Sequence, residues 1–313
     1  MRKSVCIVIP AYNEEGNLVA LASAVEEEMA ALPYDYQLLF VDDGSTDSTP
    51  DLLRRLCVHK SHIRYLRFAR NFGHQAALKA GIDYSDADAV ITLDGDGQHP
   101  PALLGTLLRH WEEGYEVVYT LRKSQDDLPL LKRMSSRLFY GLLGKLSKLD
   151  LEPGSADFRL IDRKVANELK KIQEQDIFLR GMIRWMGFRQ RPVAYEPARR
   201  LSGASKYSWK KMMVLALQGI TSFSTRPLYL AIYIGFFISF LSLLYVPFAL
   251  YSYWYGHTVS GWVSLIVTVS FLGGLQLIIL GIIGLYLGKM FMQTKGRPLY
   301  VVSETNAGTG SGA

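Results

Sequence analysis

Short apolar runs alternate with amphipathic stretches from the start of the chain to about residue 205. The runs are nearly continuous in apolar residues, which is typical of strands in a sheet whose two faces are both covered. They are SVCIVIP, YQLLFVDD, IRYLRFA, DAVITLDGD and YEVVYTLR. Helical periodicity fills intervals such as 15–32 and 46–58. This alternation predicts an α/β domain with a doubly wound, mostly parallel sheet.

Polar clusters follow three of the predicted strands. PAYNEE comes after the first strand, DDGSTD after the second and DGDGQH after a later one. Ligands of doubly wound sheets bind at the carboxyl ends of the strands. We therefore expect a single binding site to which all three clusters contribute.

Two aspartates, Asp94 and Asp96, stand one residue apart at the end of a predicted buried strand. Like charges this close repel each other unless a cation lies beside them. Mg²⁺ or Mn²⁺ would supply that cation, because both prefer oxygen ligands such as these carboxylates and the carbonyl of Gln98. A solvated acidic turn is the alternative, but the position beside two other acidic clusters favours a metal site that could hold a diphosphate.

The other two clusters offer groups that could bind a nucleotide. Tyr12 could pack on a base, and Glu14 could accept a hydrogen bond from a base or a ribose hydroxyl. Asp42 or Asp43 could bind a uracil or a ribose, and we assign this role mainly to Asp42. Asp47 stands where the next helix starts, so we interpret it chiefly as a helix cap.

Two long uncharged runs follow Arg226. They are PLYLAIYIGFFISFLSLLYVPFALYSYW and GWVSLIVTVSFLGGLQLIILGIIGLYLG. Each exceeds the roughly 20 residues that are needed to cross a bilayer. Basic residues flank the pair, whereas the link YGHTVS contains no Lys or Arg. The positive-inside rule therefore predicts a multi-pass protein with both termini in the cytoplasm and the link outside.

The change in composition divides the chain into four expected parts. They are an α/β domain at 1–205, an amphipathic interfacial helix at 206–226, two transmembrane helices at 227–290 and a cytoplasmic tail at 291–313. The segment KYSWKKMMVLALQGITSFST combines a basic start with an apolar body, which favours a helix lying on the membrane surface. The last part of the tail, SETNAGTGSGA, is small and polar, and we expect it to be disordered. The N-terminal sequence does not match a secretory signal peptide, so we expect the first domain to stay in the cytoplasm.

Charge and cysteine content disfavour a nucleic-acid partner, a disulfide and a zinc site. The net charge of +6 fits nucleic acid, anionic lipid or phosphorylated partners. The basic residues gather beside the apolar runs, and no aromatic-rich basic face stands out in the first domain, so nucleic acid is disfavoured. Cys6 and Cys57 have neither a CxxC partner nor a histidine at metal spacing, which disfavours a disulfide and a zinc site.

The motifs VIPAYNEE, VDDGSTDST, ARNFGHQAALKAG and LDGDGQHPP, in this order, resemble the family 2 glycosyltransferases of the GT-A fold. The sequence is most similar to the polyprenyl-phosphate branch, which includes dolichyl-phosphate mannosyltransferases and bacterial bactoprenol glucosyltransferases. The resemblance covers nearly the whole chain, including the paired apolar runs. It implies a Rossmann-like GT-A catalytic domain with a C-terminal two-helix transmembrane hairpin.

The resemblance also implies roles for particular residues. Asp96 and Gln98 match the metal ligands of the family, and Asp94 matches a position beside the nucleotide sugar. Arg122 matches a basic residue near the phosphates. The nucleotide pocket corresponds to Pro10, Tyr12, Glu14 and Asp42. The loop RLSGASKY resembles a phosphate-binding loop and assigns phosphate contacts to Arg200, Ser205 and Lys206.

Asp157, in GSADFRLIDRK, occupies the place of the acidic residue near the acceptor in inverting GT-A enzymes. The usual role there is that of a general base. A phosphate monoester with a second pKa of about 6 is already ionised at neutral pH, so orientation of Arg159 or of the sugar stays open as the role of Asp157. A basic helical stretch could clamp the acceptor phosphate or form a solvated face; its residues are Lys132, Arg133 and Arg137.

Polymer synthesis is disfavoured by one departure from related enzymes. Processive synthases of this fold carry Gln-x-x-Arg-Trp, but the sequence here is GMIRW, with Gly181 in place of the glutamine. The resemblance therefore implies inverting transfer of a single hexose to undecaprenyl or another polyprenyl phosphate at the cytoplasmic face of the inner membrane. The product would be a β-linked polyprenyl-phosphate sugar, with Mg²⁺ or Mn²⁺ as cofactor.

Several alternatives remain open at this point. UDP-glucose is the expected donor, and GDP-mannose, UDP-N-acetylglucosamine and an amino-arabinose nucleotide are the alternatives. A different class would be a non-catalytic membrane subunit that binds the lipid carrier. Small residues in the second apolar run could let helices approach closely, either within the chain or in a homo-oligomer.

Overall fold

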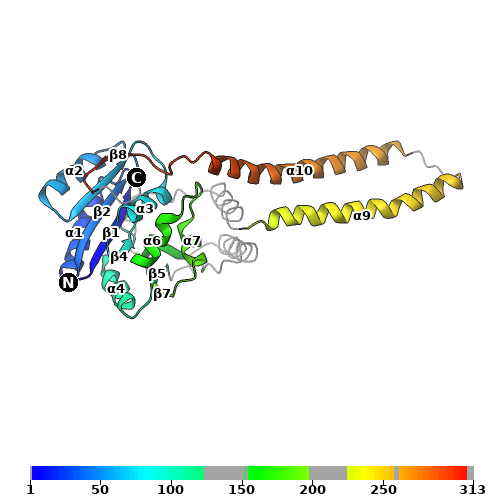
Figure 1. Cartoon of the computed structure of the whole chain (residues 1–313). Coiled ribbons are helices and arrows are strands. Elements are labelled where there is room, and N and C mark those ends of the chain that lie inside the picture. Colours follow the sequence, from blue (N-terminus) through cyan, green and yellow to red (C-terminus); the bar gives the residue numbers. More distant parts are fainter. Residues whose placement is uncertain (1, 123–151, 153, 197–223, 257–260, 309–313) are drawn as a thin grey trace. The chain divides into compact units, whose positions relative to one another are not determined.

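The structure is a computed structural model that describes residues 2–122, 152, 154–196, 224–256 and 261–308. Two compact units divide the chain: Met1–Ala216 together with Pro298–Ala313, and Leu217–Arg297. The first unit holds the sheet, and the second holds the two long apolar helices (Figure 1).

One mixed sheet forms the centre of the first unit, with the strand order β7-β5-β6-β4-β1-β2-β3-β8. Its strands are β1 Ser4–Ala11, β2 Asp35–Asp42, β3 Ile63–Phe68, β4 Ala89–Thr92, β5 Val117–Arg122, β6 Ser155–Asp162, β7 Gln190–Tyr195 and β8 Val302–Thr305. Among these strands, β6 and β8 run antiparallel to their neighbours, and the others pair in parallel. The predicted α/β class with a mostly parallel sheet is confirmed, and each predicted strand is present.

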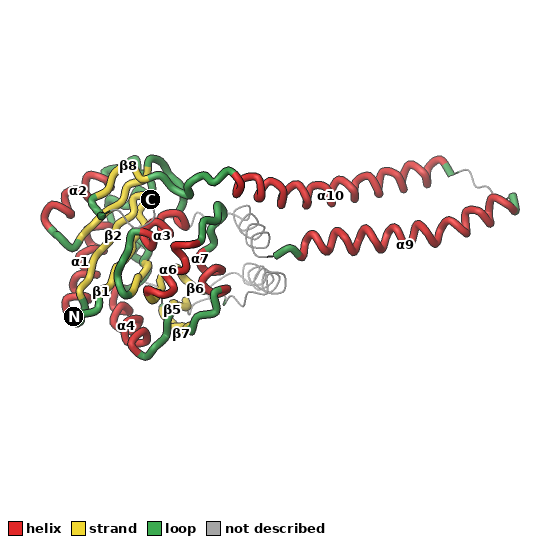
Figure 2. The backbone as a smooth tube through the Cα atoms, viewed as in Figure 1, coloured by secondary structure: helices red, strands yellow, loops and turns green. Residues whose placement is uncertain are grey.

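Helices cover both faces of the sheet (Figure 2). One layer contains α1 Leu18–Ala30, α2 Thr49–His59 and α4 Leu104–Glu112, and the other contains α3 His74–Asp83, α6 Arg163–Lys171 and α7 Leu179–Trp185. Fully buried side chains such as Ile7, Phe40 and Ile91 form the core beneath the first layer. On the opposite face α3 lies so close to β1 that a Cβ at Gly81 would stand 2.1 Å from Val8 Cγ1. Both faces are thus sealed, which explains the continuous apolar runs.

The topology brings the polar clusters to one edge of the sheet. Asp42 and Arg122 are the last residues of β2 and β5, and Asp94 follows the end of β4. Because β6 runs antiparallel to β4 and β5, its first residues lie at this same edge. Asp157 therefore lies at this edge near the start of its strand, whereas Asp42 and Asp94 lie there at or just after the ends of theirs.

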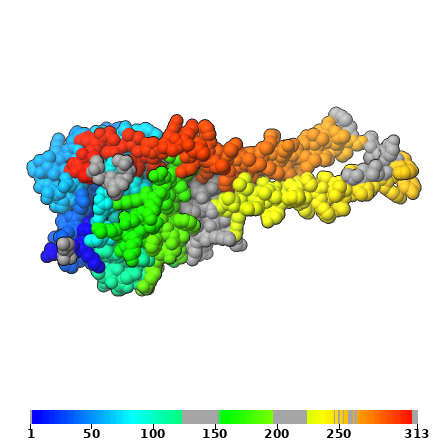
Figure 3. Space-filling model, viewed as in Figure 1, coloured from blue at the N-terminus to red at the C-terminus, as the bar shows by residue number. Residues whose placement is uncertain are grey.

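The polar tail was predicted to be disordered, and this prediction is wrong for the residues that form β8. This strand pairs antiparallel with β3, with Leu66 opposite Thr305 and Arg67 opposite Glu304. Its sequence gave little signal because the strand is short and alternates between exposed and half-buried positions. The segment lies against the first unit in the space-filling view (Figure 3) and completes the outer edge of the sheet.

Side chains also hold the β8 segment in place. The Arg54 guanidinium donates to both carboxylate oxygens of Glu304, with Nε–Oε1 at 2.9 Å and Nη2–Oε2 at 2.6 Å, and the Tyr65 hydroxyl donates to the same carboxylate. Asn306 accepts a hydrogen bond from the backbone N–H of Tyr65 at 2.7 Å through its side-chain oxygen. Such bidentate guanidinium–carboxylate pairs fix both partners in orientation.

This ion pair predicts an acid-dependent contribution to stability. The hydrogen bonds from Arg54 and Tyr65 lower the pKa of Glu304 from 4.5 to about 2. A carboxyl group with a lowered pKa stabilises the fold above its unfolded pKa, and this contribution is lost as the pH falls through the folded value. We expect Glu304→Gln to lower Tm by a constant amount above about pH 5, and the difference from wild type to shrink toward pH 2. Thermal unfolding across this range measures the effect; a difference that does not depend on pH would contradict it.

The second unit consists of α9 Arg226–Trp254 and α10 Trp262–Thr294. Both are long and apolar enough to cross a bilayer over Arg226–Tyr245 and Ser264–Thr294, and almost none of their residues are buried. Large side chains such as Phe236, Phe237 and Phe240 are exposed. In water so many exposed apolar groups would be unfavourable, so lipid is the environment that fits these helices.

The predicted domain limits are only partly covered by the described residues. The expected interfacial helix at 206–226 lies outside them except for its last three residues. The chain from Pro298 onward belongs to the first compact unit, whereas composition alone assigned 291–313 to a separate tail. The compositional limits 1–205, 206–226 and 227–290 stay predictions.

Candidate active site

The loops after β1 and β2 are locked together. Asn13, in a left-handed conformation with φ of 56°, donates its backbone N–H to Ser45 Oγ at 2.9 Å and accepts from the backbone N–H of Thr46 at 2.9 Å. The backbone N–H of Glu14 donates to Thr49 Oγ1 at 3.0 Å. These contacts explain why α1 and α2 begin three residues later than predicted: the preceding residues form the interlocked loops. They leave Tyr12 exposed at the edge, where a flat ligand could stack on it.

Asp42 and Asp43 have different surroundings. Asp42 is fully buried; its Oδ1 accepts from the backbone N–H of Ser45 at 2.9 Å, but no hydrogen bond reaches its Oδ2 within the described structure. Arg67 Nε lies 3.4 Å from that oxygen. Asp43 accepts hydrogen bonds from the backbone N–H groups of Phe72 and Gly73 and so anchors a loop. Burial raises the pKa of both carboxyls, and of the two only Asp42 has an oxygen that no described hydrogen bond reaches.

Gly44 is required by the turn between these residues and the helix. Its φ is +71°, and a Cβ there would lie 2.4 Å from the backbone carbon of Arg70. Because a backbone atom cannot move aside easily, we expect Gly44→Ala to destabilise the fold by about 2–3 kcal/mol. Thermal unfolding of the full chain measures this, with Gly16→Ala as the control because nothing lies within 4 Å of its Cβ position. Equal Tm values for the two variants would contradict the prediction.

Asp94 and Asp96 lie in the turn that follows β4. A Cβ at the intervening Gly95 would stand 2.8 Å from the carbonyl oxygen of Pro10 and 3.8 Å from Glu14 Cγ, so this turn touches the end of β1. Asp96 Oδ1 accepts from the backbone N–H of Gln98 at 3.1 Å. The structure thereby brings the first and third polar clusters together, as the topology predicted.

The surroundings of Asp94 fit a cation. His74 Nε2 lies 3.3 Å from its Oδ1 and His99 Nδ1 lies 3.6 Å from its Oδ2, yet no hydrogen bond reaches Oδ1 or His99 Nδ1 among the described residues. Burial raises the pKa of Asp94, the two histidines oppose this, and the charges of Asp157 and Asp96 raise it further. A divalent cation beside the pair would offset this repulsion.

The residues present supply part of a metal shell. Within the described ranges, no group of three His, Cys, Asp or Glu side chains is arranged to hold a metal ion. Mg²⁺ commonly binds to one or two carboxylates and takes its other ligands from water and substrate phosphates. Asp94 and Asp96 fit this arrangement. Gln98 lies in the same turn, and its Nε2 is buried without a hydrogen bond there.

Asp157 is buried and held by two arginines. Arg180 Nε and Nη2 lie 2.7 Å from its Oδ1 and Oδ2, and Arg159 Nη2 lies 3.4 Å from Oδ1. Gln75 Nε2 donates to Oδ2 at 3.3 Å. Burial opposes ionisation, but the charge and hydrogen bonds of Arg180 hold the pKa of Asp157 well below its usual range. A carboxylate with both oxygens engaged and so low a pKa suits a positioning role better than that of a general base.

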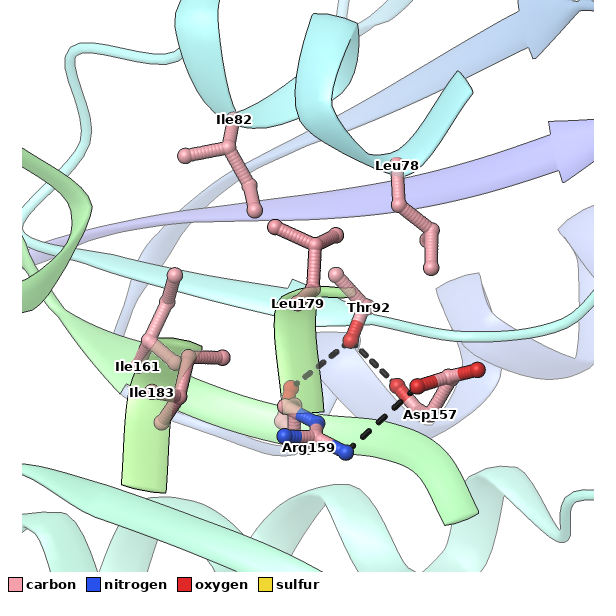
Figure 4. Close-up of a pocket in the computed structure, with 8 residues that line it drawn as sticks. All are labelled: Leu78, Ile82, Thr92, Asp157, Arg159, Ile161, Leu179 and Ile183. Atoms are coloured by element: carbon pink, nitrogen blue, oxygen red, sulfur yellow. Dashed lines mark hydrogen bonds and ion pairs between the residues drawn. The ribbon is translucent and has the colours of Figure 1, made fainter. Parts of the chain in front are cut away.

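A small, largely apolar pocket lies behind this carboxylate (Figure 4). Thr92 forms part of its wall and donates its hydroxyl to the carbonyl oxygens of Asp157 and Arg159. The apolar lining comes from α3, β6 and α7 and consists of Leu78, Ile82, Ile161, Leu179 and Ile183. The Asp157–Arg159 pair thus rests on packed helices on one side and faces the sheet edge on the other.

Five residues of this site were not assigned roles from the sequence, and one of them, His99, stands in the quoted stretch LDGDGQHPP. His74 and Gln75 stand in the quoted stretch ARNFGHQAALKAG, and Arg180 stands just before GMIRW, but spacing alone gave them no partner. Arg67 belongs to a strand that was predicted only as part of the core. The motifs marked the right segments, whereas the individual contacts depend on how α3 and α7 pack.

The predicted basic residues are only partly described. Arg122 is exposed at the end of β5, opposite Tyr195 of β7 in the ladder. Burial raises the pKa of Tyr195, and the charge of Arg122 opposes this increase. The remaining predicted phosphate contacts lie outside the described residues: Lys132, Arg133, Arg137, Arg200, Ser205 and Lys206.

Comparison with known proteins gives consistent matches. The family Glycosyl transferase family 2 matches residues 6–170. The uncharacterized glycosyltransferase YkcC of Bacillus subtilis is 40% identical over 96% of this chain and 93% of its own length. The bactoprenol glucosyl transferase of Shigella phage SfII is 36% identical over 97% of this chain and 99% of its own.

A solved structure shares the fold at low sequence identity. The mannosyltransferase PcManGT of Pyrobaculum calidifontis, solved with GDP-Man and Mn²⁺, superimposes with a TM-score of 0.51. The match covers 71% of this chain and 64% of that protein at 16% identity. At this identity the likeness concerns the fold of the catalytic domain.

Proposed function

The chain belongs to glycosyl transferase family 2 and is a glycosyltransferase, and from this premise we propose that it transfers one hexose from a nucleotide sugar to a polyprenyl phosphate. The relatives named bactoprenol glucosyl transferase support the lipid acceptor, because they match this chain over almost its whole length. The two apolar helices support it too, since a polyprenyl chain is dissolved in the bilayer. We expect the cytoplasmic face of the membrane to be the place of reaction.

The observation that carries the proposal is the meeting of four acids at one sheet edge. Asp42 and Asp94 each keep a buried carboxylate oxygen without a hydrogen bond in the described structure, Asp96 lies in the same turn as Asp94, and Asp157 is held by arginines beside them. Water would solvate such groups on an ordinary surface, whereas buried polar atoms without partners are rare. We infer that the nucleoside binds at Asp42 and the diphosphate near Asp94 and Asp96.

The proposed mechanism is a direct displacement. An oxygen of the lipid phosphate attacks the anomeric carbon from the side opposite the nucleoside diphosphate. The new C–O bond forms as the bond between the sugar and the diphosphate breaks. An α-linked donor therefore gives a β-linked product. The attacking oxygen is already ionised, so no side chain has to remove a proton. A divalent cation, when bound, neutralises the charge that develops on the departing diphosphate.

The chain's own residues orient the two substrates. Asp94 and Asp96 would hold the cation, and Arg122 would approach the phosphates from the end of β5. Asp157, fixed by Arg180, would direct Arg159 and the neighbouring Gln75 toward the sugar or the acceptor. Because the nucleophile is already charged, these residues would accelerate the reaction by positioning the substrates rather than by transferring a proton.

Full-length protein with radiolabelled nucleotide sugars, undecaprenyl phosphate and Mg²⁺ or Mn²⁺ tests the reaction. We expect UDP-glucose to be the donor, and GDP-mannose, UDP-N-acetylglucosamine and an amino-arabinose nucleotide are the competing arms. A radiolabelled lipid product with any of them supports the proposal and identifies the sugar. Binding of the lipid phosphate without transfer from any donor would instead indicate a non-catalytic carrier-binding subunit.

A further inference from the structure

The C-terminal segment Tyr300–Asn306 makes more side-chain contacts than the covering of a sheet edge requires. The Tyr300 hydroxyl donates to Asp83 Oδ2 at 3.0 Å, and its ring stacks on Phe68 with centroids 5.1 Å apart. Asp83 Oδ1 also accepts from the buried Lys79 at 2.5 Å. The segment is therefore docked on α3, the helix whose first two residues contact Asp94 and Asp157.

Arg67 lies between this segment and the proposed donor site. In the sheet it stands opposite Asp42 on one side and opposite Glu304 on the other. Side chains directly opposite in neighbouring strands share a face, so Arg67 has an acidic residue opposite it on each side. Its Nε lies 3.4 Å from Asp42 Oδ2, the buried oxygen that no described hydrogen bond reaches.

The Glu304 carboxylate has two side-chain partners, whereas the Arg67 guanidinium has one ion-pair partner, Asp42, in the described structure. Arg54 and Tyr65 hold the Glu304 carboxylate in place, while the Arg67 side chain remains 31% exposed and long enough to adopt several rotamers. The register shifts between Arg67 and Phe68, and such irregularities in a ladder redirect a side chain and occur next to active sites. The held carboxylate group of Glu304 thus belongs to the residue opposite Arg67 in the ladder, on the side away from Asp42.

We propose that the C-terminal segment contributes to the donor site and that Glu304 is a positioning residue. In this proposal Glu304 orients Arg67, and Arg67 in turn strengthens the binding of the donor nucleoside at Asp42. The proposal rests on the proposed function in that it takes Asp42 as the nucleoside contact. With Arg67 held there, the nucleoside meets a carboxylate acceptor and a guanidinium donor side by side. Without Glu304 the donor group is no longer held in place and the nucleoside binds more weakly.

A double-mutant cycle in the full-length protein tests this. The cycle compares wild type with Glu304→Gln, Arg67→Gln and the double variant. For each protein we measure donor KM, acceptor KM, kcat and Tm. We also measure the Kd of UDP and of GDP in the presence of Mn²⁺. For coupled residues of this kind we expect Glu304→Gln to raise donor KM and nucleotide Kd about fivefold, with acceptor KM unchanged. In the Arg67→Gln background the same substitution should add less than twofold. Glu168→Gln, which breaks the exposed pair with Lys171, is the control and should leave donor KM unchanged.

The possible outcomes distinguish a positioning role of Glu304 from a role in stability alone. A lower Tm for Glu304→Gln with donor KM and nucleotide Kd within twofold of wild type would overturn the proposal and leave β8 as an edge strand only. A full fivefold effect that persists in the Arg67→Gln background would also overturn it, because Glu304 would not act through Arg67. If wild type binds nucleotide but transfers no sugar, the proposed function fails while the Kd measurements still test the role of Glu304.

Discussion

Replacing Asp96 by asparagine is expected to lower kcat by about 10³-fold, the loss that corresponds to several kcal/mol of transition-state stabilisation. Asparagine keeps the shape of the side chain and can still accept from the backbone N–H of Gln98, so the turn after β4 should survive. What is lost is one of the two carboxylates that would bind the cation. Initial rates of lipid glycosylation at saturating donor, together with Tm, measure the change.

The control for this substitution removes a carboxylate charge elsewhere. Asp86→Asn breaks an exposed pair with Lys170 and should leave kcat within twofold of wild type. Chelation of divalent ions should abolish wild-type activity, and added Mn²⁺ should restore it to wild type but only weakly to Asp96→Asn. Wild-type rates in the Asp96→Asn protein at saturating Mn²⁺ would show that the acid pair does not bind the catalytic cation.

Replacing Arg180 by methionine is expected to destabilise the first unit by about 3 kcal/mol, because it leaves the buried carboxylate of Asp157 without its main counter-charge. For a domain of this size that loss corresponds to a fall in Tm of roughly 6–12 °C. Thermal unfolding of the full chain in detergent measures it. Arg55→Met, at an exposed position on α2, should shift Tm by less than 2 °C, an order-of-magnitude bound for surface substitutions.

A second substitution distinguishes charge from packing at this position. Asp157→Asn removes the charge that the Arg180 variant leaves buried, so the double variant should be more stable than Arg180→Met alone. If instead the losses of the two single variants add, the stability of α7 depends on the packing of the Arg180 side chain and not on its charge. Activity should stay low in all three variants, since Asp157 and Arg159 lose their fixed orientation.

Most of the core could be predicted because the strands β1 to β5 each carry their own signal, whereas β6, which is also mostly buried, was not predicted as a strand. All residues of β1 after Ser4 are buried, and β4 is buried throughout, so an apolar run marks each of them. The strand β7 escaped prediction because most of its residues are at least partly exposed and it contains Pro192, which is typical of an edge. The strand β8 is stabilised by partners that lie far away in the sequence, and no local pattern reveals them.

The candidate site was predictable to the level of segments. Acids at the ends of predicted parallel strands had to meet at one edge, and the structure places Asp42, Asp94 and Asp96 there. The surroundings of Asp157 could not be predicted, because Arg180 comes from α7 and Gln75 from α3, 23 and 82 positions away. Helix packing on the sheet determines these contacts, and the spacing of residues within a motif carries no information about it.

The place of β8 in the chain has a consequence for biosynthesis. Its partner strand β3 leaves the ribosome early, while Glu304 follows Tyr65 by 239 positions, beyond both apolar helices. Translation proceeds at about 5–20 residues per second, so the outer backbone groups of β3 stay unpaired for roughly ten to fifty seconds. During that interval the nascent chain presents an open strand that a second nascent chain could join. Completion of the sheet must await translation of α9 and α10, so we expect slow elongation over these helices to favour aggregation through this strand.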